Sequence, residues 1–224
     1  PVVADVLRAL VHARASFLVT GGTGTGKTTL LSTLLSEVPP GERIVLVEDS
    51  GELRPEHPHV VRLEARTANV EGRGEVDLRS LVRQALRMRP DRLVVGEVRG
   101  GEAVELLAAL NTGHEGGCGT LHANACAALP ARVEALALAA GMARDAVHSQ
   151  LAAGVDAVVH LARDRRGVRR VAEVGCLARG ADGLVTVVTA LSVSADGRLT
   201  RGAAAARLDE LIAGVSAEGE PCPV

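Results

Sequence analysis

Short apolar runs alternate with longer amphipathic segments over residues 15–155 of the chain. The segments between the runs carry apolar residues at the three- and four-residue spacing of a helix. This alternation predicts an α/β fold with a mainly parallel central sheet and helices on both faces. The expected strands are residues 17–20, 44–47, 60–63, 93–95 and 120–121, and the expected helices are residues 4–14, 77–88, 102–111, 126–140 and 143–153, with one more between Gly26 and Pro39.

The pattern changes beyond residue 156. Three further apolar runs, at residues 158–161, 168–174 and 184–193, are joined by glycine-containing turns. This spacing favours antiparallel hairpins at the edge of the main sheet, and residues 203–214 could form a last helix. We therefore expect residues 1–155 to form the core, and residues 156–224 to complete the same domain, with residues 215–224 frayed.

Composition and charge exclude several classes of protein. Hydrophobic residues make up 47% of the 224 residues and charged residues 23%, as in an ordinary globular protein. A net charge of −2 and a single aromatic residue, Phe17, argue against direct nucleic-acid binding, which needs a basic field or stacking surfaces. The four cysteines contain no C-x-x-C pair, so neither a zinc ribbon nor a disulfide framework is indicated. No uncharged run is long enough for a transmembrane segment.

A glycine-rich stretch carries the clearest chemical signal. Residues 21–28 read Gly-x-x-x-x-Gly-Lys-Thr between an apolar strand and a helix, which is a complete phosphate-binding loop. Glycines let backbone N–H groups face phosphate oxygens, and the helix N-terminus adds partial positive charge. Lys27 is the single lysine among 25 basic residues and is placed to reach the phosphates. The residues expected to bind nucleotide are Gly21, Gly22, Thr23, Gly24, Thr25, Gly26, Lys27, Thr28 and Thr29.

Acidic residues follow two other expected strands. Glu48 and Asp49 end one strand, and Glu97 ends another. Ligands in open α/β sheets lie at the carboxyl ends of strands, so these acids are candidates for holding Mg²⁺ and for activating water. The alternative is that each acid is a helix cap or a solvated turn residue.

One histidine and one arginine cluster remain. His122 follows a short strand, where it could sense or donate to a γ-phosphate, or be an ordinary loop histidine. Arg163, Arg165, Arg166, Arg169 and Arg170 surround Gly167. They are typical of a solvated hairpin, while an anionic partner or membrane surface is the sharper interpretation.

Four blocks together resemble the type II/type IV secretion ATPase superfamily. They are residues 21–29, the acidic box at residues 47–54, the stretch 85–101 and the histidine box at residues 119–124. Residues 66–83 and 111–114 are similar to the tight-adherence (Tad/Flp) pilus ATPase branch, which is close to conjugal-transfer ATPases.

The resemblance implies a RecA-like P-loop ATPase that hydrolyses Mg-ATP as a homohexameric ring. Such a ring acts in the cytoplasm, at the inner face of the cell membrane, on inner-membrane platform proteins. Related ATPases carry an N-terminal domain that completes the nucleotide site. That domain is not seen in this chain, which begins with Pro1, and we expect the chain to be a fragment.

The resemblance also implies roles for the residues of this chain that stand at the matching positions of the family's motifs. Lys27 and Thr28 are the Walker A pair, Glu97 is the Walker B acid, and His122 is the histidine-box residue. Glu97 is the preferred water-activating group, and Glu48 or Asp49 would share that role or hold Mg²⁺. The Mg²⁺ candidates are Thr28, Glu48, Asp49 and Glu97, while Glu52 also falls in the acidic box.

One position departs from the usual pattern. Gly96 stands where many P-loop proteins have Asp, so one acid is missing before Glu97. Arginines are candidates for contact with a neighbouring subunit's γ-phosphate, although a solvated helix face or interface ion pairs are the favoured explanation for each. These candidates are Arg79, Arg83, Arg87, Arg89 and Arg99.

Three functions remain open at this point. The first is a motor for pilus assembly or secretion. The second is a conjugal-transfer ATPase of a DNA-export channel. The third is a nucleotide-gated assembly scaffold with little turnover.

Overall fold

The computed structural model describes residues 2–71, 73–164 and 166–213. Over these residues one sheet has the strand order β3-β2-β4-β5-β1-β6-β7-β8-β9. The first six strands in this order run parallel, and β7, β8 and β9 continue the sheet in antiparallel fashion. The strands are β1 (Phe17–Gly21), β2 (Ile44–Glu48), β3 (Val60–Glu64), β4 (Arg92–Val98), β5 (Cys118–Leu121), β6 (Ala157–Arg163), β7 (Arg169–Arg179), β8 (Val185–Val193) and β9 (Leu199–Arg201).

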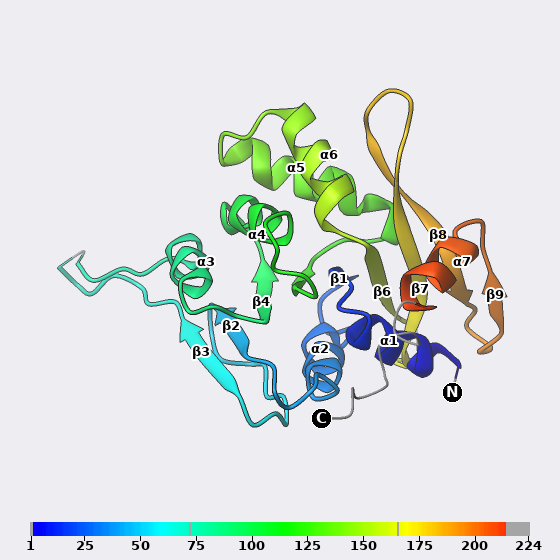
Figure 1. Ribbon diagram of the computed structural model, residues 1–224, viewed down its shortest axis with the longest axis horizontal. Coiled ribbons are helices and arrows are strands. Elements are labelled where there is room, and N and C mark those ends of the chain that lie inside the picture. The colour runs from blue at the N-terminus through cyan, green and yellow to red at the C-terminus, as the bar shows by residue number, and fades with distance from the viewer. Residues whose placement is uncertain (1, 72, 165, 214–224) are drawn as a thin grey trace, which may run out of the picture.

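Helices cover both faces of the sheet (Figure 1). The apolar sides of α3, α4, α5 and α6 pack into one core, and those of α1, α2 and α7 pack into a second core on the opposite face. Buried strands with apolar residues on both faces separate the two cores, as expected for parallel sheets. The helices are α1 (Val2–His12), α2 (Lys27–Leu35), α3 (Leu78–Leu86), α4 (Glu102–Leu110), α5 (Leu129–Ala139), α6 (Arg144–Gly154) and α7 (Ala205–Ala213).

The expected α/β architecture is confirmed, with three differences of detail. The predicted helix over residues 126–140 begins as a 3₁₀ turn, η1 (Cys126–Ala128), before α5 starts beside Pro130. Strand β9 was not predicted, since three residues are too few to show a period. Strand β6 pairs in parallel with β1 as well as antiparallel with β7, so it joins the two parts of the sheet.

The connections determine where the loops meet. The chain leaves β1 through α2 on one face, whereas α3 and α4 follow β3 and β4 on the other face. The carboxyl ends of β1, β2, β4 and β5 therefore lie at one edge, where crossovers to opposite faces leave room for a ligand. None of the described helices has the length and apolar character needed to cross a membrane.

Candidate active site

The phosphate-binding loop links β1 to α2. Gly24 and Gly26 have φ values of 72° and 94°, a left-handed conformation that other residues adopt only with strain. Gly26 caps α2 without a side-chain hydrogen bond, so the N–H groups of the first helical turn remain available to an anion. Gly21 has φ 149°, and a Cβ there would lie 2.6 Å from the Leu161 carbonyl oxygen of the adjacent strand. The loop geometry thus requires the glycines that the sequence provides.

Lys27 lies inside this loop. Its Nζ donates hydrogen bonds of 3.1 Å to the carbonyl oxygens of Gly21 and Gly22, and it lies 3.5 Å from Nε2 of His122. Burial lowers the pKa of Lys27, and the nearby Glu97 carboxylate partly opposes that shift. The ammonium is held at the loop by weak neutral acceptors, which phosphate oxygens can replace.

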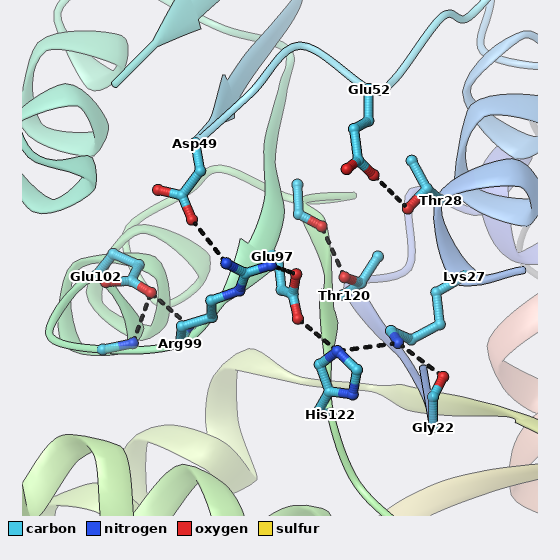
Figure 2. Close-up of polar contacts among 12 residues, drawn as sticks. Gly22, Lys27, Thr28, Asp49, Glu52, Glu97, Arg99, Glu102, Thr120 and His122 are labelled. Atoms are coloured by element: carbon cyan, nitrogen blue, oxygen red, sulfur yellow. Dashed lines mark hydrogen bonds and ion pairs between the residues drawn. The ribbon is translucent and has the colours of Figure 1, made fainter. Parts of the chain in front are cut away.

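Four polar side chains form a connected row across the carboxyl ends of the strands (Figure 2). His122 Nε2 lies 2.7 Å from Glu97 Oε1, and the other Glu97 oxygen accepts from the Arg99 guanidinium. Arg99 also pairs with Asp49, at 3.4 Å. Together with Lys27, these residues connect the phosphate-binding loop to the acidic box.

The environment keeps Glu97 ionised. Burial on its own would raise the pKa of this carboxyl, but the hydrogen bond and charge of Arg99, with the charges of His122 and Lys27, lower it overall. An ionised carboxylate beside the phosphate-binding loop can accept a proton from water.

Glu48 faces the same region but is held differently. It is 4% exposed, and its Oε1 accepts from the backbone N–H groups of Glu52 and Leu53 at 3.0 and 2.8 Å. Burial raises the pKa of Glu48, while these two hydrogen bonds lower it in part. Because its carboxylate binds the backbone, Glu48 shapes the loop that carries Asp49 and Glu52.

The absence of a side chain at Gly96 has a steric explanation. A Cβ on Gly96 would lie 2.8 Å from Cγ of Glu48, which is closer than real contacts allow. Glu48 from β2 therefore occupies the space that an aspartate of β4 would need. Thr120 of β5 also binds this strand, since its hydroxyl donates to the Gly96 carbonyl oxygen at 2.7 Å.

Thr28 has an acidic partner to which the sequence assigned no role. Its hydroxyl donates to Glu52 Oε2 at 3.3 Å (Figure 2). Thr28 and Glu52 line one small cavity with Glu48, Asp49, Ser50, Gly96, Glu97 and Arg99. Among the described residues no three metal-binding side chains form a cage by themselves. The hydroxyl and carboxylate oxygens nevertheless suit Mg²⁺, which usually binds one or two carboxylates together with substrate phosphates.

The arginine candidates separate into three environments. Arg99 lies within the site, in contact with acids of its own chain. Arg79 and Arg83 of α3 each bind Glu105 of α4 at 2.8 Å, which explains them as an interhelical ion-pair group. Arg87 and Arg89 are exposed beyond the end of α3.

Sequence reasoning missed two features around these residues. Glu102, 5% exposed, accepts from the backbone N–H groups of Arg99 and Gly100 at 2.5 and 2.7 Å and so fixes the Arg99 turn. An acid three residues after Arg99, in the first turn of an expected helix, could have indicated this cap. The second feature is the β6–β7 hairpin, which lies against the phosphate-binding loop; Arg165 of that hairpin is outside the described residues.

The strand order and the loop after β1 place the protein in the RecA-like class of P-loop α/β folds. The chain belongs to the Type II/IV secretion system protein family, whose model matches residues 2–202. This match confirms the superfamily resemblance drawn from the four blocks.

Similar proteins refine the placement. A Mycobacterium tuberculosis protein named for conjugal transfer is 62% identical over 189 residues, covering 84% of this chain and 53% of the relative. The conjugal transfer protein TrbB of Rhizobium radiobacter is 36% identical, over 76% of this chain and 51% of its own. The crystal structure of the Brucella suis VirB11 ATPase, in complex with sulphate, is 31% identical with a TM-score of 0.68, over 77% of this chain and 51% of that one.

The two relatives are named for conjugal transfer, and the solved structure is named as a type IV secretion system ATPase. The chain spans about half the length of the curated relatives it matches.

Proposed function

We propose that this chain is the catalytic part of a Mg-ATP-hydrolysing motor of a type II/IV secretion apparatus. The observation that carries the proposal is the row from Lys27 through His122, Glu97 and Arg99 to Asp49. It joins a phosphate-binding loop to an ionised carboxylate on an adjacent part of the sheet, as nucleotide hydrolysis requires.

Each residue of the row has a distinct task. The loop N–H groups and Lys27 bind the β- and γ-phosphates, with Lys27 exchanging the Gly21 and Gly22 carbonyl oxygens for phosphate oxygens. Glu97 orients the attacking water and accepts its proton. His122 lies between Lys27 and Glu97, so a γ-phosphate that binds Lys27 would also change the contact between His122 and the Glu97 carboxylate.

Thr28 and Glu52 provide oxygen ligands beside the phosphate-binding loop. Bound Mg²⁺ would neutralise phosphate charge there. Thr28 would ligate it through the hydroxyl that now donates to Glu52, and Glu52 and Asp49 would hold its waters. Glu48 would not bind Mg²⁺ itself. Its carboxylate holds the backbone of the loop that carries Asp49 and Glu52.

Arg99 restrains the site in this conformation. Its guanidinium binds Glu97 and Asp49 at once, so a carboxylate that must accept a proton is neutralised by a cation. Arg99 would release Glu97 when nucleotide or a neighbouring subunit offers the guanidinium another anion.

Membership of the family supports a proposal for the assembly and its partners. We propose a homohexameric ring at the cytoplasmic face of the membrane, working with inner-membrane platform proteins. Residues 1–155 would supply the nucleotide-binding core and residues 156–224 would complete the same domain. The chain covers only about half of its relatives, and further segments of the family would complete the site.

Two machines are candidates for the motor. Pilus assembly of the Tad/Flp type is supported by the pattern of residues 66–83 and 111–114. A conjugal-transfer channel is supported by the relatives of Mycobacterium tuberculosis and Rhizobium radiobacter, both of which are named for conjugal transfer. Hydrolysis that DNA stimulates would favour the conjugal-transfer channel.

The test is steady-state Mg-ATP hydrolysis, with the mass of the protein in solution measured with and without nucleotide. We expect turnover that Lys27→Ala and Glu97→Gln abolish, while Arg198→Ala in the distant β8–β9 turn serves as a matched charge control. Nucleotide binding with unchanged basal turnover in Glu97→Gln would reject Glu97 as the catalytic base and favour a nucleotide-gated scaffold. If the wild type binds nucleotide without turnover, repeating the assay with a chain as long as its relatives separates an incomplete site from a scaffold.

A further inference from the structure

The arginine cluster of the β6–β7 hairpin lies beside the phosphate-binding loop. Strand β6 pairs in parallel with β1, with Gly21 opposite Leu161, so the hairpin begins where the loop begins. A Cβ placed on Gly24 would lie 3.7 Å from a terminal nitrogen of Arg163, and one on Gly26 would lie 3.5 Å from Cδ of Arg169. Both side chains therefore lie beside the loop that holds Lys27.

The two arginines face each other in an unfavourable way. Arg163 and Arg169 are directly opposite residues of the antiparallel β6–β7 pair. Like charges in that position destabilise a sheet. Neither guanidinium forms an ion pair with a carboxylate of the described residues, although the chain has more acidic than basic residues. A local arrangement that works against stability is expected chiefly at functional positions.

The hairpin also holds Arg163 in place. Its Nε donates to the Gly167 carbonyl oxygen at 3.3 Å, which leaves the terminal nitrogens free of hydrogen bonds to the described residues. Asp164 stabilises the turn by accepting from the N–H groups of Arg166 and Val168 at 2.9 and 2.8 Å. Arg163 and Arg169 are both exposed, and one terminal nitrogen of Arg163 lies on the side of the hairpin that faces Gly24.

We propose that Arg163 and Arg169 bind the phosphate chain of the nucleotide in cis, as a second cationic wall of the site. The inference rests on the proposed nucleotide-binding function and adds two phosphate-binding residues to it. A polyphosphate would be the negatively charged partner that the two facing guanidiniums do not have among the described residues. Planar arginine side chains also suit phosphate oxygens. The hairpin then senses whether the loop is occupied, since a bound anion removes the repulsion across β6 and β7.

The test is isothermal titration calorimetry with ADP and a non-hydrolysable ATP analogue, both with Mg²⁺. The double variant Arg163→Ala/Arg169→Ala should bind each nucleotide about tenfold or more weakly, because two charge-assisted contacts are lost. Arg166→Ala removes one charge from the same turn without contact to the loop, and it should bind within about twofold of wild type. The double variant should lose its deficit at high salt, which screens exposed charges.

Three controls make the result decisive. Without nucleotide, the double variant should unfold at the same temperature as wild type or higher, because the repulsion is gone. If the folded double variant binds nucleotide like wild type while Lys27→Ala does not, the hairpin proposal is wrong and the proposed function stands. If wild type binds neither nucleotide, both are wrong.

Binding to anionic vesicles of phosphatidylglycerol tests whether the two arginines bind a membrane surface instead of nucleotide. Sedimentation with such vesicles should not differ between wild type and the double variant. A loss of vesicle binding at unchanged nucleotide affinity would assign the arginines to a membrane surface and overturn the proposal.

Discussion

Replacing Gly96 by alanine tests the steric account of the incomplete acidic pair. The new Cβ would lie 2.8 Å from Cγ and 3.2 Å from Oε1 of Glu48, so one of the two strands must shift or Glu48 must turn away. If Glu48 turns, its carboxylate releases the N–H groups of Glu52 and Leu53. The substitution thus disturbs both the sheet and the acidic box.

The expected cost follows from these contacts. Overpacking a close-packed interior costs roughly 1–3 kcal/mol. Releasing buried N–H groups from a carboxylate costs about 1–3 kcal/mol more, while alanine offsets roughly 0.4–1 kcal/mol by restricting the unfolded chain. We expect Gly96→Ala to lower the free energy of unfolding by about 2–4 kcal/mol.

Urea unfolding followed by circular dichroism measures this change. Fluorescence is unsuitable because Phe17 is the only aromatic residue. Gly41→Ala is the matched control, since a Cβ at Gly41 meets nothing within 4 Å and its φ is ordinary. That control should be neutral or more stable by up to about 1 kcal/mol.

A double-mutant cycle identifies the cause. In a Glu48→Ala background the clash partner is absent, so Gly96→Ala should cost at least ~1 kcal/mol less than in wild type. Equal effects of Gly96→Ala and Gly41→Ala, or an unchanged cost in the Glu48→Ala background, would refute the claim that Glu48 occupies the space beside Gly96.

Three further predictions concern charge and burial. Burial alone would raise the pKa of Glu97, but Arg99, His122 and Lys27 lower it overall. Replacing Arg99 by glutamine should therefore raise that pKa and move the acidic limb of the pH–rate profile to higher pH. An acidic limb that does not move would contradict the role of Glu97 as base. Cys118, Cys126 and Cys176 are buried, and burial raises the pKa of Cys118 and of Cys126 to about 12 and also raises that of Cys176. In a Cys222→Ser variant no thiol should therefore react with a disulfide reagent at neutral pH until the protein unfolds, and rapid reaction would contradict the buried core. Glu42 forms an ion pair of 2.6 Å with Arg92, which is 2% exposed. Glu42→Ala should leave the buried guanidinium unpaired and lower the free energy of unfolding in urea by about 3–5 kcal/mol. A decrease below ~1 kcal/mol would show that Arg92 finds another partner.

The features that could be predicted from the sequence depend on residues that are close together in the chain. The phosphate-binding loop is contiguous, so its glycines, Lys27 and Thr28 indicated the site without any tertiary knowledge. Alternating apolar segments predicted the parallel α/β sheet, because each period reports how one element is buried. The rule that parallel strands present their carboxyl ends at one edge brought Glu48, Asp49, Glu97 and His122 to the same region.

Tertiary structure decided how those groups divide their tasks. Glu48 binds backbone N–H groups and fills the space beside Gly96, whereas Arg99 binds acids of its own chain. The hairpin arginines reach the phosphate-binding loop only because β6 pairs with β1, about 140 residues earlier in the chain. Periodicity identifies a strand and its buried face, but parallel strands share the same pattern. The neighbour of each strand, and hence the side chains that meet at its end, is therefore determined by packing across the whole sheet.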